Sequence, residues 1–206
     1  MIDVYYGSSP NGYKVLILLE ELEIPYRIVP VDLNGDLPAI PGFLEASPDG
    51  RIPAIVDHQP DSGAGPPCSV FESGAILLYL AQKTGRFLPK DPASRLEVMK
   101  WLFWQVATFG PVLGQLGYFR NSRSPQEEVV DYFVGQATRL YRLLDRQLKG
   151  REYVAGLYSI ADMAIYPWTV LHEKQRQNLP DYPNLMRWYF AMEEREAVER
   201  AYDIDD

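Results

Sequence analysis

The sequence predicts an α+β protein, with a small mixed sheet in its first part and helices alone in the rest. Two observations support this fold class. Over the first 85 residues, short strand-like runs alternate with longer helix-like segments, whereas beyond about residue 88 apolar residues recur only at spacings of three and four. A stretch stiffened by Pro89 and Pro92 separates the two parts. We therefore expect one domain at 1–85, a linker at 86–92 and an all-helical domain at 93–206.

The elements of the first domain follow the order β-α-β-α-β-β-α. Strands are predicted at 2–6, 26–32, 52–57 and 69–71, long helices at 10–23 and 73–83, and a short helix around Phe43. Strands joined through a helix run parallel by a right-handed crossover, whereas strands separated only by the loop 57–68 can pair antiparallel. The predicted result is a mixed sheet with flanking helices.

The second domain reads as a bundle. One helix is predicted at 93–109, and a second begins at about Gln126, with apolar residues at positions 130, 133, 137, 140, 144 and 148. Ser159 and Asp162 have the spacing of a capping box, in which a hydroxyl and an acid cap the first turn of a helix. This pair predicts a buried helix at 160–173, and a last helix follows Pro183.

Composition narrows the possible functions. The chain has 206 residues, 47% of them apolar, which is enough for a full core. Its formal charge of −8 argues against a nucleic-acid or anionic-membrane partner. The longest apolar run, at 75–81, is too short to span a bilayer, and the first residues alternate like a strand rather than a signal peptide.

The single cysteine and the two histidines also limit the possible sites. Because Cys68 is the single cysteine, no internal disulfide is possible, and a cytoplasmic setting is expected. His58 and His172 do not have the spacing of metal ligands, so no metal site is expected.

Two segments together suggest a holder for a short peptide with a free α-amino acid end. Glu72 and Ser73 open an apolar helix, where the acid can take an ammonium group while the hydroxyl and the free N–H groups take a carboxylate. About twenty residues earlier, Ile52 precedes Pro53 and a β-branched run. The Ile52 backbone can pair with an extended peptide, as an added strand does at a sheet edge.

A third segment, Ser-Ser-Pro-Asn-Gly at 8–12, lies where the first strand ends and the first helix begins. Ser9 is a plausible N-cap, and the helix N-terminus can face an anion. The helix dipole contributes about 0.3–1 kcal/mol and a charged hydrogen bond about 1.5–3 kcal/mol. Together they would lower the pKa of a ligand thiol by roughly one to two units and make its thiolate available at neutral pH.

Each segment also has an ordinary structural interpretation. Ser-Pro-Asn-Gly is a common helix entrance. Ile52 and Pro53 could simply begin an edge strand, and Glu72 could favour the dipole of its helix. The aromatic residues of the predicted helices, such as Trp101 and Trp104, are more typical of a core than of a ligand pocket. The combination of segments, rather than any one of them, favours a binding site.

The same segments resemble cytosolic glutathione transferases over nearly the whole chain. More narrowly, Ser-Pro-Asn-Gly-Tyr-Lys at 9–14, Ile-Pro-Ala-Ile-Val-Asp at 52–57, Phe-Glu-Ser-Gly-Ala-Ile-Leu-Leu-Tyr-Leu at 71–80 and Trp-Leu-Phe-Trp-Gln-Val at 101–106 are similar to the nu-class group. The resemblance implies a thioredoxin-like N-terminal domain, a helical C-terminal domain and a homodimer. It also implies glutathione, reduced or oxidised, as the co-substrate.

The resemblance further implies a role for each residue of the predicted site. Glu72 and Ser73 would hold the γ-glutamyl end of glutathione, Ile52 would pair with the cysteinyl backbone, Pro53 would be cis, and Arg51 would lie near the glycyl carboxylate.

In this group no tyrosine or cysteine activates the thiol. Instead a Thr or Ser two residues before an Asn faces the sulfur, which here means Ser9 with Asn11. Ser8 is the rival, since related classes use a serine two residues before the loop proline. We expect Ser9.

Two positions depart from the group's pattern. Related sequences commonly have Gln near Pro38 and Arg at the position of Tyr132, so two polar contacts to the anionic ligand are missing. Lys14, Arg120 or Arg123 could compensate.

The resemblance leaves three functions open. The first is glutathione-dependent reduction of small or mixed disulfides. The second is conjugation of glutathione to electrophiles, which needs an apolar acceptor pocket. The third is a non-catalytic, regulatory glutathione-binding dimer. Retention of Ser9, Asn11, Glu72 and Ser73 favours an enzyme.

Overall fold

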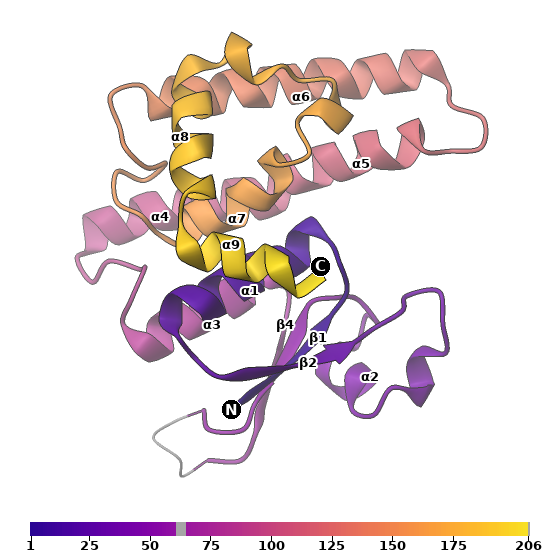
Figure 1. Ribbon diagram of the computed structural model, residues 1–206, viewed down its shortest axis with the longest axis vertical. Helices are drawn as coiled ribbons and strands as arrows, with labels where there is room; N and C mark the ends of the chain where they lie inside the picture. Colours follow the sequence, from indigo (N-terminus) through magenta and orange to yellow (C-terminus); the bar gives the residue numbers. More distant parts are fainter. Residues whose placement is uncertain (61–64, 206) are drawn as a thin grey trace. The chain divides into compact units, whose positions relative to one another are not determined.

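The computed structural model of the protein describes residues 1–60 and 65–205, so part of the predicted loop at 57–68 lies outside the described residues. The chain forms two compact units (Figure 1). One combines Met1–Leu88 with Glu196–Asp206, and the other is Pro89–Arg195. An α+β fold with a mixed sheet and a helical second part is thereby confirmed.

The first unit contains a four-stranded sheet of order β2-β1-β3-β4. Strand β1 pairs in parallel with β2, and both other pairings are antiparallel, as predicted. Its elements are β1 (Ile2–Tyr6), α1 (Pro10–Leu22), β2 (Tyr26–Pro30), η1 (Leu37–Ala39), α2 (Phe43–Ala46), β3 (Ala54–Asp57), β4 (Cys68–Phe71), α3 (Ser73–Thr84), α9 (Glu196–Tyr202) and η5 (Asp203–Asp205).

Both faces of the sheet are covered. Tyr5 and Ala54 lie opposite each other on β1 and β3 and form a buried cluster with Phe43 of α2. Their neighbours Val4 and Ile55 point to the other face, because side chains alternate along a strand, and they are fully buried. Figure 1 shows α1 and α3 packed side by side in this unit. Burial on both faces explains why β1 is apolar nearly throughout.

The last helix of the chain belongs to the first unit and packs against α1. The Tyr13 and Tyr202 rings stack with centroids 4.0 Å apart, and Arg200 Nε donates to Glu20 Oε2 over 2.8 Å. The sequence assigned these residues to the helical part, because periodicity marks a helix but does not show which core it covers. The predicted domain limits therefore remain a prediction. In the structure, the segment that begins at Glu196 packs with the sheet-containing unit.

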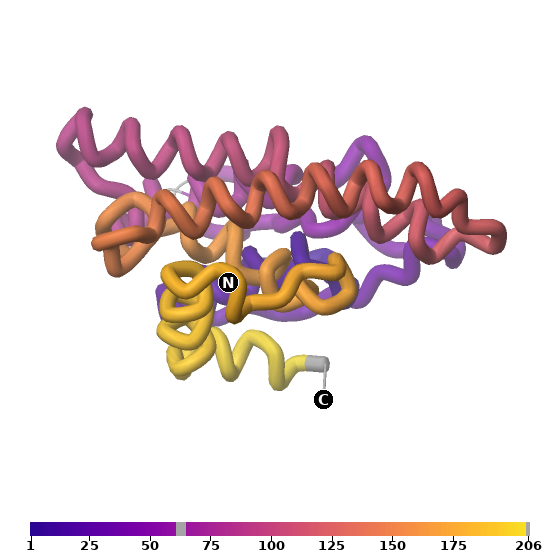
Figure 2. The backbone as a smooth tube through the Cα atoms, turned by 90° about the horizontal axis from the view of Figure 1, so that it is seen from above, coloured from indigo at the N-terminus to yellow at the C-terminus, as the bar shows by residue number. Residues whose placement is uncertain are grey.

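The second unit is helical. Its elements are α4 (Pro92–Trp104), a π-helical segment labelled η2 (Gln105–Phe109), α5 (Gly110–Arg120), α6 (Glu127–Leu148), α7 (Ile160–Thr169), η3 (Glu173–Gln175), η4 (Leu179–Asp181) and α8 (Pro183–Glu193). Figure 2 shows α5 and α6 running alongside each other. The predicted apolar stripe of α6 is buried at Val130, Ala137, Leu140, Leu144 and Leu148.

Two helical predictions need correction. The helix predicted at 93–109 does not end there, because the chain continues through the π-helical segment into α5. The helix predicted at 160–173 ends at Thr169. Pro167 lies inside it, and the Gln175 side chain donates to the Trp168 carbonyl over 2.8 Å, so a side chain replaces the next turn.

The capping box of α7 is confirmed. Ser159 accepts a hydrogen bond from Ala161 N–H, and Asp162 accepts from the N–H of Ser159 over 3.0 Å. The fully buried Asp162 also accepts from Val154 N–H and from Trp188 Nε1, each over 2.9 Å. Burial raises the pKa of Asp162 to about 6, although these hydrogen bonds oppose the rise.

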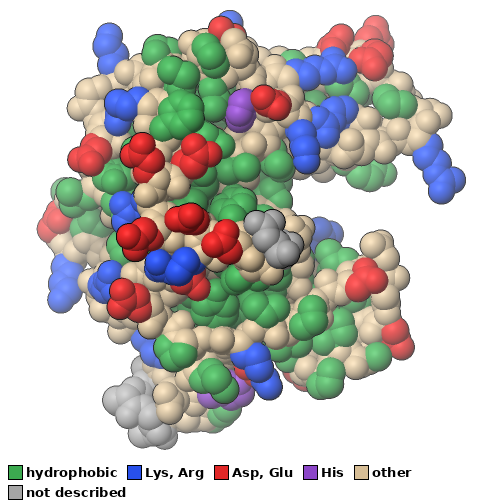
Figure 3. Space-filling view, viewed as in Figure 1, with side chains coloured by type: hydrophobic (Ala, Val, Ile, Leu, Met, Phe, Trp, Pro, Cys, Tyr) green, Lys and Arg blue, Asp and Glu red, His purple; other side chains and the backbone are tan. Residues whose placement is uncertain are grey.

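The surface is mixed in charge. Acidic and basic side chains are interspersed over the face seen in Figure 3. Within the described residues, no helix has both the length and the apolarity needed to cross a membrane.

Candidate functional site

The backbone at the start of α3 has an unusual conformation. Glu72 has a φ of 69°, in the region that favours glycine, although it carries a side chain. Such backbone strain costs about 1–3 kcal/mol and is concentrated at functional sites. Glu72 does not cap its own helix with its side chain, which is exposed. Its carbonyl accepts from Ile76 N–H over 2.9 Å, so the strained residue is held in place as the first turn forms.

Helix α3 is also tied to the sheet. The buried Asp57, at the end of β3, accepts hydrogen bonds from Tyr79 over 2.8 Å and from Lys83. Burial alone would raise the pKa of the Asp57 carboxyl, but the hydrogen bonds from Lys83, the Gln59 N–H and Tyr79, together with the charge of Lys83, lower it. These contacts fix α3 and therefore the position of Glu72 and Ser73.

Ser73 lies against a buried lysine of α1. Lys14 Nζ donates to Ser73 Oγ over 3.3 Å, and Lys14 is only 1% exposed. Burial lowers the pKa of Lys14 to about 7, and the charge of Glu72 partly opposes this shift. The sequence suggested Lys14 only as a possible extra cation for the ligand. The one feature of the sequence that could have indicated its burial is its position as a charged residue among the apolar residues of α1.

The Ile52–Pro53 peptide bond is cis, as the resemblance implied. Strand β3 begins at Ala54, so Ile52 lies just before the strand rather than at its predicted start. The buried Ser47 holds the preceding residue: its hydroxyl donates to the Arg51 carbonyl over 2.7 Å and accepts from Arg51 N–H over 3.1 Å. Sequence reasoning missed Ser47, whose partner is local but belongs to no recognised capping pattern.

The Arg51 side chain points away from these backbone contacts. It is 80% exposed and pairs with Asp49, with Nε 2.7 Å from Oδ2. Exposed pairs of this kind contribute at most about 1 kcal/mol, so the guanidinium can exchange Asp49 for another carboxylate at little cost.

Ser9 is the N-cap of α1, as predicted. Its Oγ accepts the Gly12 N–H over 3.1 Å, and Pro10 occupies the first turn. Because Oγ already accepts, the Ser9 hydroxyl proton can be donated to another group. The half-buried Asn11 lies in the same turn. Ser8 is exposed, with its Oγ 3.2 Å from the Tyr13 hydroxyl.

Two glycines allow the close approach of this loop to its neighbours. A Cβ at Gly12 would lie 2.6 Å from the Tyr6 ring, and a Cβ at Gly7 would lie 2.9 Å from Ile52 Cδ1. Ile52 therefore lies directly beside the segment that leads into α1. The Lys14–Ser73 contact joins the same helix to the start of α3, so the structure brings three of the predicted segments together.

The remaining candidate residues lie on or next to other elements. Pro38 is exposed in η1, and Tyr132 is exposed on α6. Arg120 donates to the Lys174 carbonyl. Arg123 is exposed beyond the end of α5.

Cys68 begins β4, whereas Glu72 follows its end. Four residues of extended chain span about 13 Å, so this thiol is not at the site. Within the described ranges, no group of three or more His, Cys, Asp or Glu residues could hold a metal ion.

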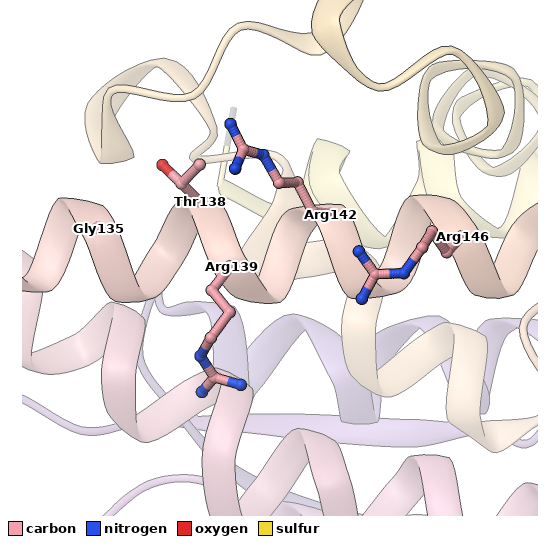
Figure 4. A pocket seen from close by; sticks show the side chains of 5 residues that line it. All are labelled: Gly135, Thr138, Arg139, Arg142 and Arg146. Atoms are coloured by element: carbon pink, nitrogen blue, oxygen red, sulfur yellow. The ribbon is translucent and has the colours of Figure 1, made fainter.

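A separate hollow lies along α6 of the helical unit. It is lined by Gly135, Thr138, Arg139, Arg142 and Arg146. Figure 4 shows that Arg139 and Arg142 point to opposite sides of the helix, so the guanidinium groups do not converge on one ligand atom. The hollow contains none of the predicted site residues.

Known proteins match this chain over nearly its full length. A family model for the glutathione S-transferase N-terminal domain matches residues 8–83, and one for the C-terminal domain matches residues 107–196. The disulfide-bond oxidoreductase YfcG of Escherichia coli K12 is 44% identical over 98% of this chain and 94% of its own length. A second Escherichia coli oxidoreductase, YghU, is 38% identical over 97% of this chain and 73% of its own length.

Solved structures show the same relationship. A glutathione transferase family member from Pseudomonas fluorescens, with two glutathione molecules bound, has a TM-score of 0.88 at 36% identity and covers 97% of this chain and 91% of its own. A glutathione transferase from Pseudomonas putida, with one glutathione disulfide bound per subunit, has a TM-score of 0.87 at 38% identity and covers 97% of this chain and 90% of its own. The chain therefore belongs to the glutathione S-transferase family.

Proposed function

We propose that this protein is a glutathione-dependent disulfide-bond reductase of the nu-class type. One observation carries the proposal: a helix-capping serine, Ser9, has a hydroxyl proton available for a ligand thiolate, in a chain 44% identical to a disulfide-bond oxidoreductase. The related structures that contain glutathione or glutathione disulfide support the ligand. With Cys68 at the far end of β4, the reacting thiol must come from glutathione itself.

The binding roles follow from the chemistry of each group. Glu72 would accept the ammonium of the γ-glutamyl end, while Ser73 and the first N–H groups of α3 would take its carboxylate. The Ile52 backbone would pair with the cysteinyl residue in the manner of an added strand. Arg51 would exchange Asp49 for the glycyl carboxylate.

The reaction is thiol–disulfide exchange. The glutathione thiolate, stabilised by Ser9, by Asn11 and by the N-terminus of α1, attacks one sulfur of a disulfide. A mixed disulfide with glutathione forms, and the other half of the substrate leaves as a thiolate that takes up a proton. A second glutathione thiolate then attacks the mixed disulfide, giving glutathione disulfide and the second reduced thiol. The two electrons come from two glutathione molecules, so the protein needs no redox group of its own.

The setting of the enzyme is part of the proposal. We expect a homodimer in the cytoplasm, where reduced glutathione is available. Loss of the arginine at the position of Tyr132 removes one contact to an anionic ligand. We therefore expect weaker binding of the second glutathione than an arginine at this position would give.

A coupled assay tests this function. The pure protein is given 2-hydroxyethyl disulfide, glutathione, glutathione reductase and NADPH, and a parallel reaction contains glutathione and chlorodinitrobenzene. Because the site stabilises a thiolate that can attack or leave, we expect rapid NADPH consumption and weak conjugation.

Either of the other two functions would give a different result. Strong conjugation with little disulfide reduction would make the protein a conventional transferase. Neither activity, with glutathione still bound, would favour a regulatory protein. Both outcomes would contradict the proposal.

A further inference from the structure

Lys14 is the charged residue that the proposed mechanism does not use. It lies in α1 between buried residues, with Gly12 on one side and Val15 and Leu16 on the other, and is 1% exposed. Burying an ammonium group is costly unless it is paired, and an apolar side chain of similar length would fill the same space. The lysine is therefore kept for its contacts rather than for its volume.

The Lys14–Ser73 contact has a direction. In its protonated form Lys14 donates hydrogen bonds and accepts none, so Ser73 Oγ is then the acceptor at 3.3 Å. The Ser73 proton must then point to a different acceptor. Because Ser73 is the first residue of α3, its neighbourhood already favours negative charge through the helix dipole. A hydroxyl held in this way can donate to a ligand carboxylate. The lone pair that accepts from Lys14 cannot also accept from a ligand ammonium.

Glu72, one residue before Ser73, instead favours a positively charged ligand group. Its exposed carboxylate precedes Ser73 in the chain, and its charge also acts on Lys14. The site thus places the Glu72 carboxylate next to Ser73, the residue that the buried Lys14 contacts. Such a pair matches the ammonium and the carboxylate on one α-carbon.

We propose that Lys14 is a positioning residue that fixes Ser73 as a hydrogen-bond donor and supplies the positive charge behind it, so that the site selects ligands with a free α-carboxylate. This inference rests on the proposed function, because it concerns the γ-glutamyl end of glutathione. It adds a residue that does not touch the ligand and assigns the carboxylate half of the recognition to it.

Three ligands that differ by one group test the proposal. They are S-methylglutathione, its analogue without the α-carboxylate (4-aminobutyryl in place of γ-glutamyl) and its analogue without the α-amino group (glutaryl in place of γ-glutamyl). The S-methyl group removes thiol ionisation from the measurement. Their dissociation constants are measured by calorimetry with five full-length proteins: the wild type, Lys14→Met, Ser73→Ala, the double variant of these two, and Glu72→Gln.

Lys14→Met should weaken both ligands that contain the α-carboxylate about tenfold or more, since a charge-supported hydrogen bond is lost. It should leave the analogue without the α-carboxylate, which keeps only the glycyl carboxylate, within about twofold of wild type. In the Ser73→Ala background, Lys14→Met should cost much less, because the hydroxyl through which it acts is gone. Glu72→Gln is the matched control and should instead weaken the ligands that contain the α-amino group.

Equal weakening of all three ligands by Lys14→Met would overturn the proposal and leave Lys14 as a packing residue. If Lys14→Met does not fold, Lys14→Gln replaces it, since the amide can still donate to Ser73 but has no charge. Lys14→Gln should again weaken only the two ligands that contain the α-carboxylate, and equal weakening of all three would again overturn the proposal. If the wild type fails to bind S-methylglutathione, the proposed function itself is wrong.

Discussion

At the scale of single residues, Glu72 has a strained backbone conformation that the surrounding fold maintains. A non-glycine residue at a φ of 69° is strained, yet the chain keeps a carboxylate there instead of a glycine. The contacts of Asp57 and the first turn of α3 hold that conformation. The proposed binding of a ligand ammonium by Glu72 would account for this strain.

This explanation predicts a difference between two substitutions of Glu72. Glu72→Gly and Glu72→Ala should both weaken glutathione binding severalfold or more, because the ammonium loses its partner. The glycine variant should be more stable than the alanine variant by about 1 kcal/mol, since only glycine relieves the strain at positive φ. Urea unfolding and calorimetry measure the two effects. An alanine variant at least as stable as the glycine variant would contradict the strain argument.

At the scale of elements, the start of α7 is organised by one buried carboxylate. Asp162 accepts from the N–H groups of Val154 and Ser159 and from the Trp188 indole. It therefore joins the segment before α7 to α8 as well as capping its own helix. A buried acceptor with several donors contributes more to the stability of the fold than a simple cap, because its removal leaves each donor without a hydrogen-bond partner.

Asp162→Ala should thus lower the stability of the protein by several kcal/mol, at about 1–3 kcal/mol for each buried donor left without a partner. Ser159→Ala should cost only about 1 kcal/mol, the usual effect of losing an N-cap. Thermal unfolding followed by circular dichroism compares the two variants. Similar small losses for both would show that the network contributes no more than a cap.

The elements also show what periodicity can and cannot predict. The strands and the N-termini of α1, α3 and α7 were predictable, because alternation and capping residues act locally. Helix α5 was missed: Gly110, Gly114 and Gly117 are unfavourable for an isolated helix. Packing explains Gly110, since a Cβ there would lie 2.9 Å from Nε2 and 3.3 Å from the carbonyl oxygen of the buried Gln105, whereas a Cβ at Gly114 would only be in ordinary contact with the Trp168 ring. Tertiary contacts thus override propensity there.

At the scale of the whole molecule, every residue proposed to hold glutathione lies in the first unit, on segments far apart in the sequence. Ser9, Ile52, Glu72 and Ser73 could be singled out from the sequence because each lies at or just before the start of an element, where backbone groups are free.

Lys14 and Ser47 could not be predicted in their roles. Lys14 contacts Ser73, 59 positions away, and the Ser47 side chain holds the backbone of Arg51 in the loop that follows α2. The first contact depends on the tertiary structure, and the second is local but follows no recognised sequence pattern.

The central claim is that the protein stabilises a ligand thiolate with the Ser9 hydroxyl. The most direct test is the pKa of the glutathione thiol when bound, followed by the ultraviolet absorbance of the thiolate across a pH titration of wild type, Ser9→Ala and Ser8→Ala. We predict a bound-thiol pKa roughly one to two units below its ordinary value in the wild type and in Ser8→Ala. In Ser9→Ala it should return towards that value. An unshifted pKa in the wild type, or loss of the shift in Ser8→Ala instead, would contradict the claim.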